Sequence, residues 1–131
     1  MNANIFEKDL IIKFFELRQI YSKPSYELLD KVEVLSRDYT GVGFYTSFEK
    51  HECLKVADSK INYIWAYMGA FLNKEKINVG FVFYIKDGYL EMIEGYSYGE
   101  QTWPDHIESY DIFELRARAG RRPRSRYSHR A

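Results

Sequence analysis

The sequence predicts an α+β domain in which an antiparallel sheet of about five strands carries one or two helices on one face. Three features predict it: an amphipathic stretch near the N-terminus, a central hairpin rich in aromatic and β-branched residues, and further β-like segments before and after that hairpin. The chain has 131 residues, of which 46% are hydrophobic and 18% aromatic, enough for one core and too few for two. We therefore expect a single domain over residues 1–115.

The first element is predicted to be an amphipathic helix from Glu7 to Tyr21. Its large apolar side chains recur every three or four residues and so share one stripe. They are Leu10, Ile11, Phe14, Phe15, Leu17 and Tyr21. Pro24 is expected to end this helix, because the residue before a proline avoids the helical region. A second short helix is predicted over residues 26–31, with Leu28 and Leu29 turned inward.

Two strands are predicted to follow, joined by a tight reversal that contains two glycines. Residues Val32–Tyr39 lean towards a strand, and Phe44–Phe48 would form the returning strand. Val42, Phe44 and Thr46 are expected on the inward face. The alternative register, shifted by one residue, would bury less apolar surface.

The segment after residue 48 is harder to assign. Residues 49–60 are predicted to form a loop with one brief strand. For Ile61–Leu72, the apolar spacing favours a helix, whereas the tyrosines and β-branched isoleucines suit a strand. We predict a strand there, on the family resemblance described below. The domain is then expected to finish with an edge strand from Ile107 to Leu115.

A β-hairpin over Val79–Tyr98 is predicted at the centre of the fold. Asp87-Gly88 suits a two-residue turn that needs φ > 0 at both positions. This turn predicts the pairs Lys86/Tyr89, Ile85/Leu90, Phe83/Met92 and Phe81/Glu94. One apolar face would then hold Phe81, Phe83, Ile85, Leu90 and Met92. Because a hairpin alone is marginal in water, that face needs a cover, for which the first helix is well suited.

Charge is divided unevenly along the chain. Residues 116–131 hold seven arginines and no acidic residue, so residues 1–115 keep 12 of the 19 basic and all 19 acidic residues, a formal charge of −7. We interpret residues 116–131 as translated vector sequence, an out-of-frame extension or a disordered segment. The alternative is an arginine-rich arm that binds nucleic acid. The body itself is not expected to bind nucleic acid directly, because its charge would repel phosphate.

The chain carries no feature that would direct it to a membrane or out of the cell. No apolar run reaches the ~18 residues needed to cross a bilayer, and the start lacks the layout of a secretory signal. The single cysteine, Cys53, cannot form an internal disulfide, which fits a reducing compartment. We expect a cytoplasmic protein with no membrane partner.

Residues with catalytic or metal-binding chemistry are few. His51 and Cys53 form an H-x-C pair without a second pair at zinc spacing, and the glycine pair that begins at Gly41 lacks the rest of a dinucleotide loop. Cys53 and His106 would act as a nucleophile couple only if the fold brings them together. Glu94, at the margin of an apolar face, is either satisfied by backbone amides or a tyrosine, or is a functional acid. We expect no cofactor, no metal and no enzymatic activity; a hydrolase around Cys53, His106 or Glu94 is one alternative.

Aromatic and acidic residues gather late in the body and form the candidate surface for a protein partner. Aromatic side chains supply contact area, and carboxylates steer a basic partner. The candidate residues are Glu91, Glu94, Tyr96, Tyr98, Glu100, Trp103, Asp105, Glu108 and Asp111. In one alternative these tyrosines only fill the boundary of the core. In another, Tyr96, Tyr98 and Trp103 line a concave pocket for a small molecule or nucleotide.

Two segments resemble a family of small bacterial proteins. Residues Ser36–Phe48, SRDYTGVGFYTSF, and Gly80–Ile107, GFVFYIKDGYLEMIEGYSYGEQTWPDHI, are similar to its "TGvGFyT" hairpin and its "GF-x-F-x-kDG-x-L-x-x-lEGY-x-y-x-x-x-WP" block. Some members resemble immunity proteins of toxin–immunity pairs, including contact-dependent growth inhibition systems. Ile93 stands where the family tends to have Leu, and the connection Asn73–Asn78 is longer and more charged than the resemblance implies.

The resemblance implies an antiparallel sheet with one or two helices on one face. It also implies a cytoplasmic antitoxin that binds and neutralises a cognate toxin domain, in many such systems a basic nuclease. An acidic body agrees with that role, since an anionic surface can occlude a basic cleft. Unprotected edge strands would also permit a homodimer.

Overall fold

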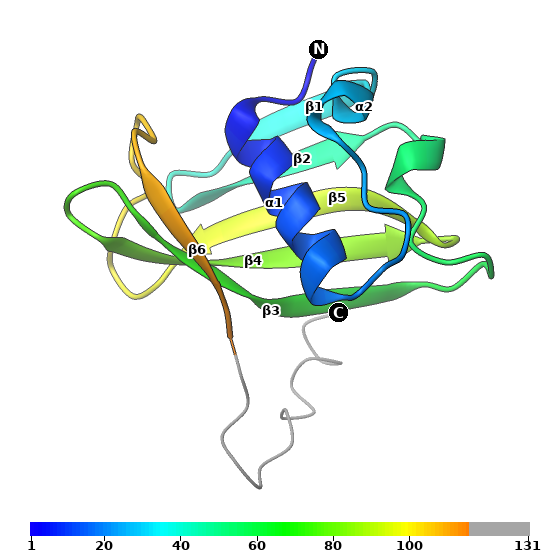
Figure 1. The fold of residues 1–131 in the computed structure, drawn as a ribbon. Helices are drawn as coiled ribbons and strands as arrows, with labels where there is room; N and C mark the ends of the chain where they lie inside the picture. Colours follow the sequence, from blue (N-terminus) through cyan, green and yellow to red (C-terminus); the bar gives the residue numbers. More distant parts are fainter. Residues whose placement is uncertain (116–131) are drawn as a thin grey trace, which may run out of the picture.

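The computed structural model describes residues 1–115 and shows a six-stranded antiparallel sheet with a long helix across one face (Figure 1). The elements are α1 (Ile5–Leu17), α2 (Tyr26–Leu29), β1 (Val34–Tyr39), β2 (Gly43–Phe48), η1 (Glu52–Leu54), β3 (Tyr63–Leu72), β4 (Ile77–Lys86), β5 (Tyr89–Ser97) and β6 (Tyr110–Glu114). The strands are arranged β1-β2-β5-β4-β3-β6, so the β4–β5 hairpin is central. The predicted α+β class is confirmed, with six strands where about five were expected. The interpretation of residues 116–131 lies outside the described residues.

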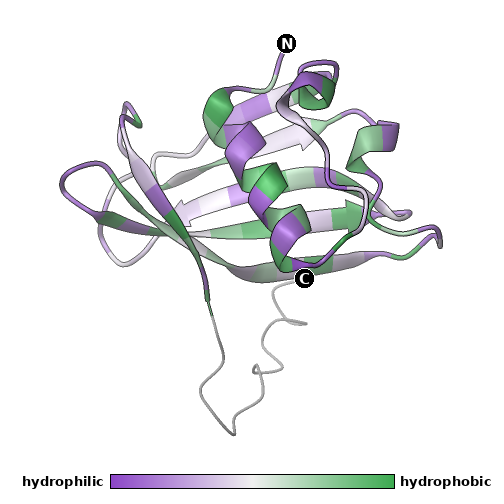
Figure 2. Ribbon diagram, viewed as in Figure 1, coloured by the Kyte–Doolittle hydropathy of each residue, from purple (hydrophilic) through white to green (hydrophobic). Residues whose placement is uncertain are grey.

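Helix α1 covers the central strands. It begins with a capping box, in which Asn4 and Glu7 each accept a hydrogen bond from the other's backbone N–H. The predicted stripe is buried at Leu10, Ile11, Phe14 and Phe15. Phe14 stacks on Phe83 of β4 with ring centroids 4.7 Å apart, and Figure 2 shows hydrophobic and hydrophilic residues alternating along the helix. Among residues 1–115, no helix is long and apolar enough to cross a membrane.

The predicted end of the first helix is wrong. The helix stops at Leu17, because Gln19 takes a φ of 55° and the N–H of Ile20 bonds to the carbonyl of Phe15. This is a Schellman-type termination with Gln in the position that glycine usually holds. Tyr21 is therefore fully exposed and does not extend the apolar stripe. In α2, Leu29 is buried as predicted, whereas Leu28 is exposed because this helix is only four residues long.

The central hairpin has the predicted turn but a different register. Asp87 and Gly88 have φ of 54° and 85°, and the pairs Lys86/Tyr89 and Ile85/Leu90 form as expected. Beyond them Glu91 is an extra residue in β5, a β-bulge that moves every later side chain to the other face. The predicted pairs Phe83/Met92 and Phe81/Glu94 are therefore wrong, and the observed pairs are Phe83/Ile93, Phe81/Gly95 and Val82/Glu94. Ile93, fully buried, takes the core place expected for Met92.

The flanking strands follow the prediction more closely. Phe44 and Thr46 are buried on the face beneath α1, whereas Val42 lies in the turn and is exposed, contrary to the prediction. The strand prediction for Ile61–Leu72 is confirmed by β3, which pairs with β4 and β6. The predicted edge strand near the end of the body is β6, at one margin of the sheet. The region 49–60 holds η1 and a single bridge between Lys55 and Tyr89.

Candidate functional site

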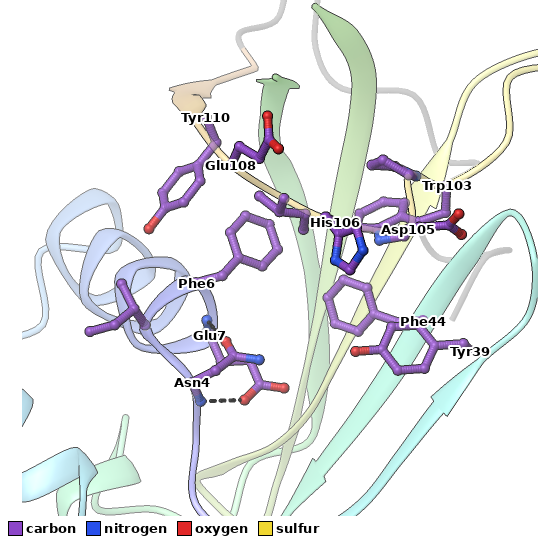
Figure 3. Close-up of a pocket in the computed structure, with 13 residues that line it drawn as sticks. Asn4, Phe6, Glu7, Tyr39, Phe44, Trp103, Asp105, His106, Glu108 and Tyr110 are labelled. Carbon is purple, nitrogen blue, oxygen red and sulfur yellow. Dashed lines mark hydrogen bonds between the residues drawn. The ribbon is translucent and has the colours of Figure 1, made fainter. Parts of the chain in front are cut away.

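A pocket of about 530 Å³ lies between the first turn of α1 and the segment that joins β5 to β6 (Figure 3). Five aromatic residues from four parts of the chain form much of its lining: Phe6, Tyr39, Phe44, Trp103 and Tyr110. We call this the aromatic pocket. Its position on the α1 face was not predicted from the sequence.

Contacts between rings hold the walls of the aromatic pocket in place. Phe44 and Trp103 meet edge to face with centroids 5.2 Å apart, and Phe6 meets Tyr110 at 4.9 Å. Phe44 needs the glycine beside it on β5, because a Cβ on Gly95 would lie 2.2 Å from the Phe44 ring. The ring therefore lies directly against the backbone of β5, a close approach that only glycine permits.

A buried carboxylate forms the floor of the pocket. Glu7 is only 2% exposed, and its oxygens accept hydrogen bonds from Nε and Nη2 of Arg37 at 2.8 and 2.7 Å. The Thr46 hydroxyl donates a third bond at 2.8 Å, and the N–H of Asn4 a fourth at 2.9 Å. The hydrogen bond to Glu7 also raises the pKa of Arg37. Because the Glu7 carboxylate already accepts four hydrogen bonds, it has a structural role and little capacity left to bind a ligand.

Side-chain hydrogen bonds fix the segment from Trp103 to Tyr110 that forms the upper wall. Asn73 donates from its side-chain amide to the carbonyl of His106 at 2.8 Å and accepts from the N–H of Glu108 at 2.7 Å. The Tyr110 hydroxyl donates to Asp9 of α1. Burial, and then this bond, raise the pKa of Tyr110. The wall is thus tied to α1 and to the turn between β3 and β4.

The rim of the aromatic pocket carries uncompensated negative charge. Asp105 and Glu108 are exposed, and neither carboxylate makes a hydrogen bond or ion pair with another residue of the described chain. Figure 3 shows both at the margin of the pocket, pointing away from Phe6, with the His106 ring next to the Phe44 ring in that view. None of the residues that line the pocket within 1–115 is Lys or Arg. A cation entering the pocket therefore meets no lysine or arginine among these described residues.

The structure divides the predicted partner surface between two faces of the sheet. Trp103, Asp105 and Glu108 lie at the aromatic pocket on the α1 face. Glu94 and Tyr96 line a separate hollow of about 300 Å³ on the opposite face, with Val82 and Tyr84. Tyr98 packs against Tyr96 there, with ring centroids 5.4 Å apart. Tyr96, Tyr98 and Trp103 therefore do not line one common pocket.

The remaining predicted residues lie outside both hollows or at their margins. Glu91 is the bulge residue and approaches Lys86 at 4.0 Å. Glu100 is exposed in the connection from β5 to β6. Asp111 is exposed on β6, next to Tyr110 and on the opposite side of the strand because side chains alternate.

Glu94 is satisfied by tyrosines. The Tyr84 hydroxyl donates to it at 2.7 Å and the Tyr45 hydroxyl at 3.2 Å. Burial, followed by the hydrogen bond to Glu94, raises the pKa of Tyr84. The predicted tyrosine partner of Glu94 is therefore confirmed, and two tyrosines supply it.

The side chains considered for nucleophilic or metal chemistry are not assembled. Cys53 lies in η1, where its Sγ is 3.8 Å from the carbonyl of Leu28, while His106 lies at the aromatic pocket, in the connection from β5 to β6. Figure 1 shows that connection and the segment between β2 and β3 at opposite ends of the sheet. Burial raises the pKa of the Cys53 thiol to about 11, which disfavours the nucleophilic thiolate. Across residues 1–115, no group of three His, Cys, Asp or Glu side chains is placed to hold a metal ion.

Comparisons with known proteins found no relative of this chain. No family model matches the chain, and searches against curated proteins and against solved structures found no match either.

Sequence reasoning missed Glu7, Phe6 and Tyr39 as parts of the site. One signal for Glu7 was present: it stands three and four residues before Leu10 and Ile11, and so lies on the apolar stripe of the helix. A charge on such a stripe requires a buried partner. The identity of that partner, Arg37, depends on the pairing of β1 with β2 and is not visible in the spacing.

Proposed function

We propose that this protein is an immunity protein that binds a cognate toxin domain, a basic nuclease or similar basic protein, and neutralises it without making or breaking a bond. The observation that carries the proposal is the rim of the aromatic pocket, where the carboxylates of Asp105 and Glu108 have no partner among residues 1–115 and the ring of Tyr39 is exposed. The charge of −7 over residues 1–115 and the resemblance of Ser36–Phe48 and Gly80–Ile107 to immunity proteins support it.

Such a surface suits the physics of a tight inhibitor. Uncompensated carboxylates accelerate encounter with a basic protein and make the association rate depend on salt. Aromatic side chains that are already ordered cost little conformational entropy when they are buried in a complex, so they act as anchors. Tyr39 on β1, which is 66% exposed, supplies such a ring. Trp103 is only 9% exposed and instead orders the wall, because its ring contacts Phe44 and its backbone N–H donates to the carbonyl of Gly41.

Co-expression tests this function directly. The partner to test is the protein encoded by the adjacent open reading frame, produced with and without this protein, with cell growth and complex formation as readouts. We expect growth arrest by the partner alone, rescue by this protein and a 1:1 complex after purification. A partner that is harmless, or that arrests growth equally with and without this protein, would refute the proposal.

A second candidate function is binding of a small molecule. It is favoured by the volume of the aromatic pocket, about 530 Å³, which falls in the range typical of ligand sites. The expected occupant is a compound with an aromatic or cationic group, held by the rings of the wall. A thermal-shift screen of nucleotides and metabolites checks this: a stabilising compound whose effect is lost in Trp103→Ala would support it.

A further inference from the structure

We propose that the aromatic pocket receives the side chain of one arginine of the partner protein, with its guanidinium stacked on the aromatic wall and drawn in by Asp105 and Glu108. This inference rests on the proposed function and deepens it, because it names the side chain that the interface recognises. Its basis is the combination of an aromatic cavity with two rim carboxylates that have no partner among residues 1–115.

The walls of the pocket suit a flat, delocalised cation. Guanidinium groups stack on aromatic faces and are more weakly hydrated than ammonium groups, so they enter such sites at a smaller desolvation cost than lysine. Trp103 and Phe44 are already fixed against each other, and Tyr39, which is 66% exposed, stands at the mouth. An apolar side chain would find the same walls but would gain nothing from the charged rim.

The charges at the rim exclude the opposite kind of occupant. A phosphate or a carboxylate would face Asp105 and Glu108, with no Lys or Arg among the described lining residues to offset them. Glu7 does not compete for the incoming cation, because its oxygens already accept four hydrogen bonds. The two rim carboxylates are therefore the groups that distinguish arginine from a neutral side chain of the same shape.

The pocket is also organised before any partner arrives. The backbone of the upper wall is held by Asn73, and Tyr110 is held by Asp9. Interfaces that are ordered in advance lose less entropy on binding. The site is therefore expected to bind a short arginine-containing peptide by itself, although weakly.

The test is an NMR titration of the full chain with the pentapeptide acetyl-Gly-Gly-Arg-Gly-Gly-amide. Matched peptides carry lysine or neutral citrulline, which has the shape of arginine without its charge, at the central position. We expect the arginine peptide to shift the indole N–H of Trp103, assigned by Trp103→Phe, and the amides of residues 103–110. Lysine is expected to bind about 3-fold more weakly and citrulline about 10-fold more weakly. Equal binding of the citrulline peptide, or shifts confined to other surfaces, would overturn the inference.

The carboxylates are tested by a double variant with a matched control. Asp105→Asn with Glu108→Gln removes two negative charges at the rim, and binding of the arginine peptide is expected to weaken about 3- to 10-fold. Glu27→Gln with Asp87→Asn removes the same charge from exposed positions outside the pocket lining, and should leave binding within about 2-fold. An equal loss of peptide binding in both variants would show a general charge effect and would contradict arginine binding at the aromatic pocket.

The outcomes separate this inference from the proposed function. If the toxin binds the rim variant as tightly as the unaltered protein, the arginine site is wrong and the immunity function stands. If the arginine peptide binds but no toxin does, the site stands and the function fails. Micromolar binding of a free guanidinium compound such as agmatine, with no gain from the peptide, would make this a small-molecule site and overturn the inference.

Discussion

The floor and the rim of the aromatic pocket use the same chemical group for different purposes. Glu7 on the floor is buried and accepts four hydrogen bonds, two of them from Arg37. Glu108 on the rim is exposed and its carboxylate has no partner among residues 1–115. A buried charge persists only where its partners are complete, whereas an exposed charge costs the fold little. The floor should therefore govern stability, and the rim recognition.

The largest expected effect is on the floor. Glu7→Ala would leave Arg37, whose side chain is only 17% exposed, as an uncompensated charge beside the core. We expect a loss of about 3–5 kcal/mol in the free energy of unfolding, measured by urea denaturation. The matched change on the rim, Glu108→Ala, should stay within about 0.5 kcal/mol. Similar losses in both variants would remove the distinction between the two carboxylates.

A smaller loss of stability is expected at the contact between Phe44 in the pocket wall and Gly95 of β5. Gly95→Ala would push a methyl group into the ring of Phe44, and we expect about 1–3 kcal/mol of destabilisation from overpacking. Combining it with Phe44→Leu should cost less than the sum of the two single changes, because the smaller side chain makes room. Strict additivity in urea denaturation would contradict the close contact.

The sequence predicted the features that depend on neighbouring residues and failed where the fold depends on the register between strands. Local signals were sufficient for the α1 stripe and for the turn at Asp87-Gly88. They also selected Trp103, Asp105 and Glu108, which the structure brings to one pocket; their role in recognition stays a prediction. The bulge at Glu91 was not predictable, because one extra residue leaves the alternation intact on either side of it and only reverses its phase. That reversal helps place Glu94 and Tyr96 on the face away from α1. The predicted partner surface therefore became two surfaces.

A smaller change in stability is expected at alkaline pH from two tyrosines: Tyr110, which bonds to Asp9 at the pocket wall, and Tyr84, which bonds to Glu94 on the opposite face of the sheet. The raised pKa values of Tyr84 and Tyr110 mean that folding favours their neutral forms. Their contribution to stability is fully present below the unfolded pKa of about 10 and is lost as the pH rises above it. We expect the free energy of unfolding to decline above about pH 10. The double variant Tyr84→Phe with Tyr110→Phe should decline less steeply, and an equal decline would refute this assignment.

The smallest effect is expected from the arginine-rich end of the sequence. If recognition depends on the rim, deleting residues 116–131 should leave the affinity for the partner within about 2-fold, measured by isothermal titration calorimetry. The physical reason is that these arginines carry the same sign as the basic partner and add no attraction. A large loss of binding on deletion would instead support an arm that takes part in recognition.

The most direct test of the central claim is the association rate constant with the cognate toxin domain, measured by stopped flow at low and high salt. Binding that is steered by the anionic body should slow by about 10-fold or more between roughly 50 and 500 mM NaCl, since salt screens exposed charges. For the rim variant Asp105→Asn with Glu108→Gln, the association rate constant should be lower at low salt and should change less as salt is added. A rate that does not change with salt, or a protein that binds no basic partner and turns over a small molecule, would contradict the account.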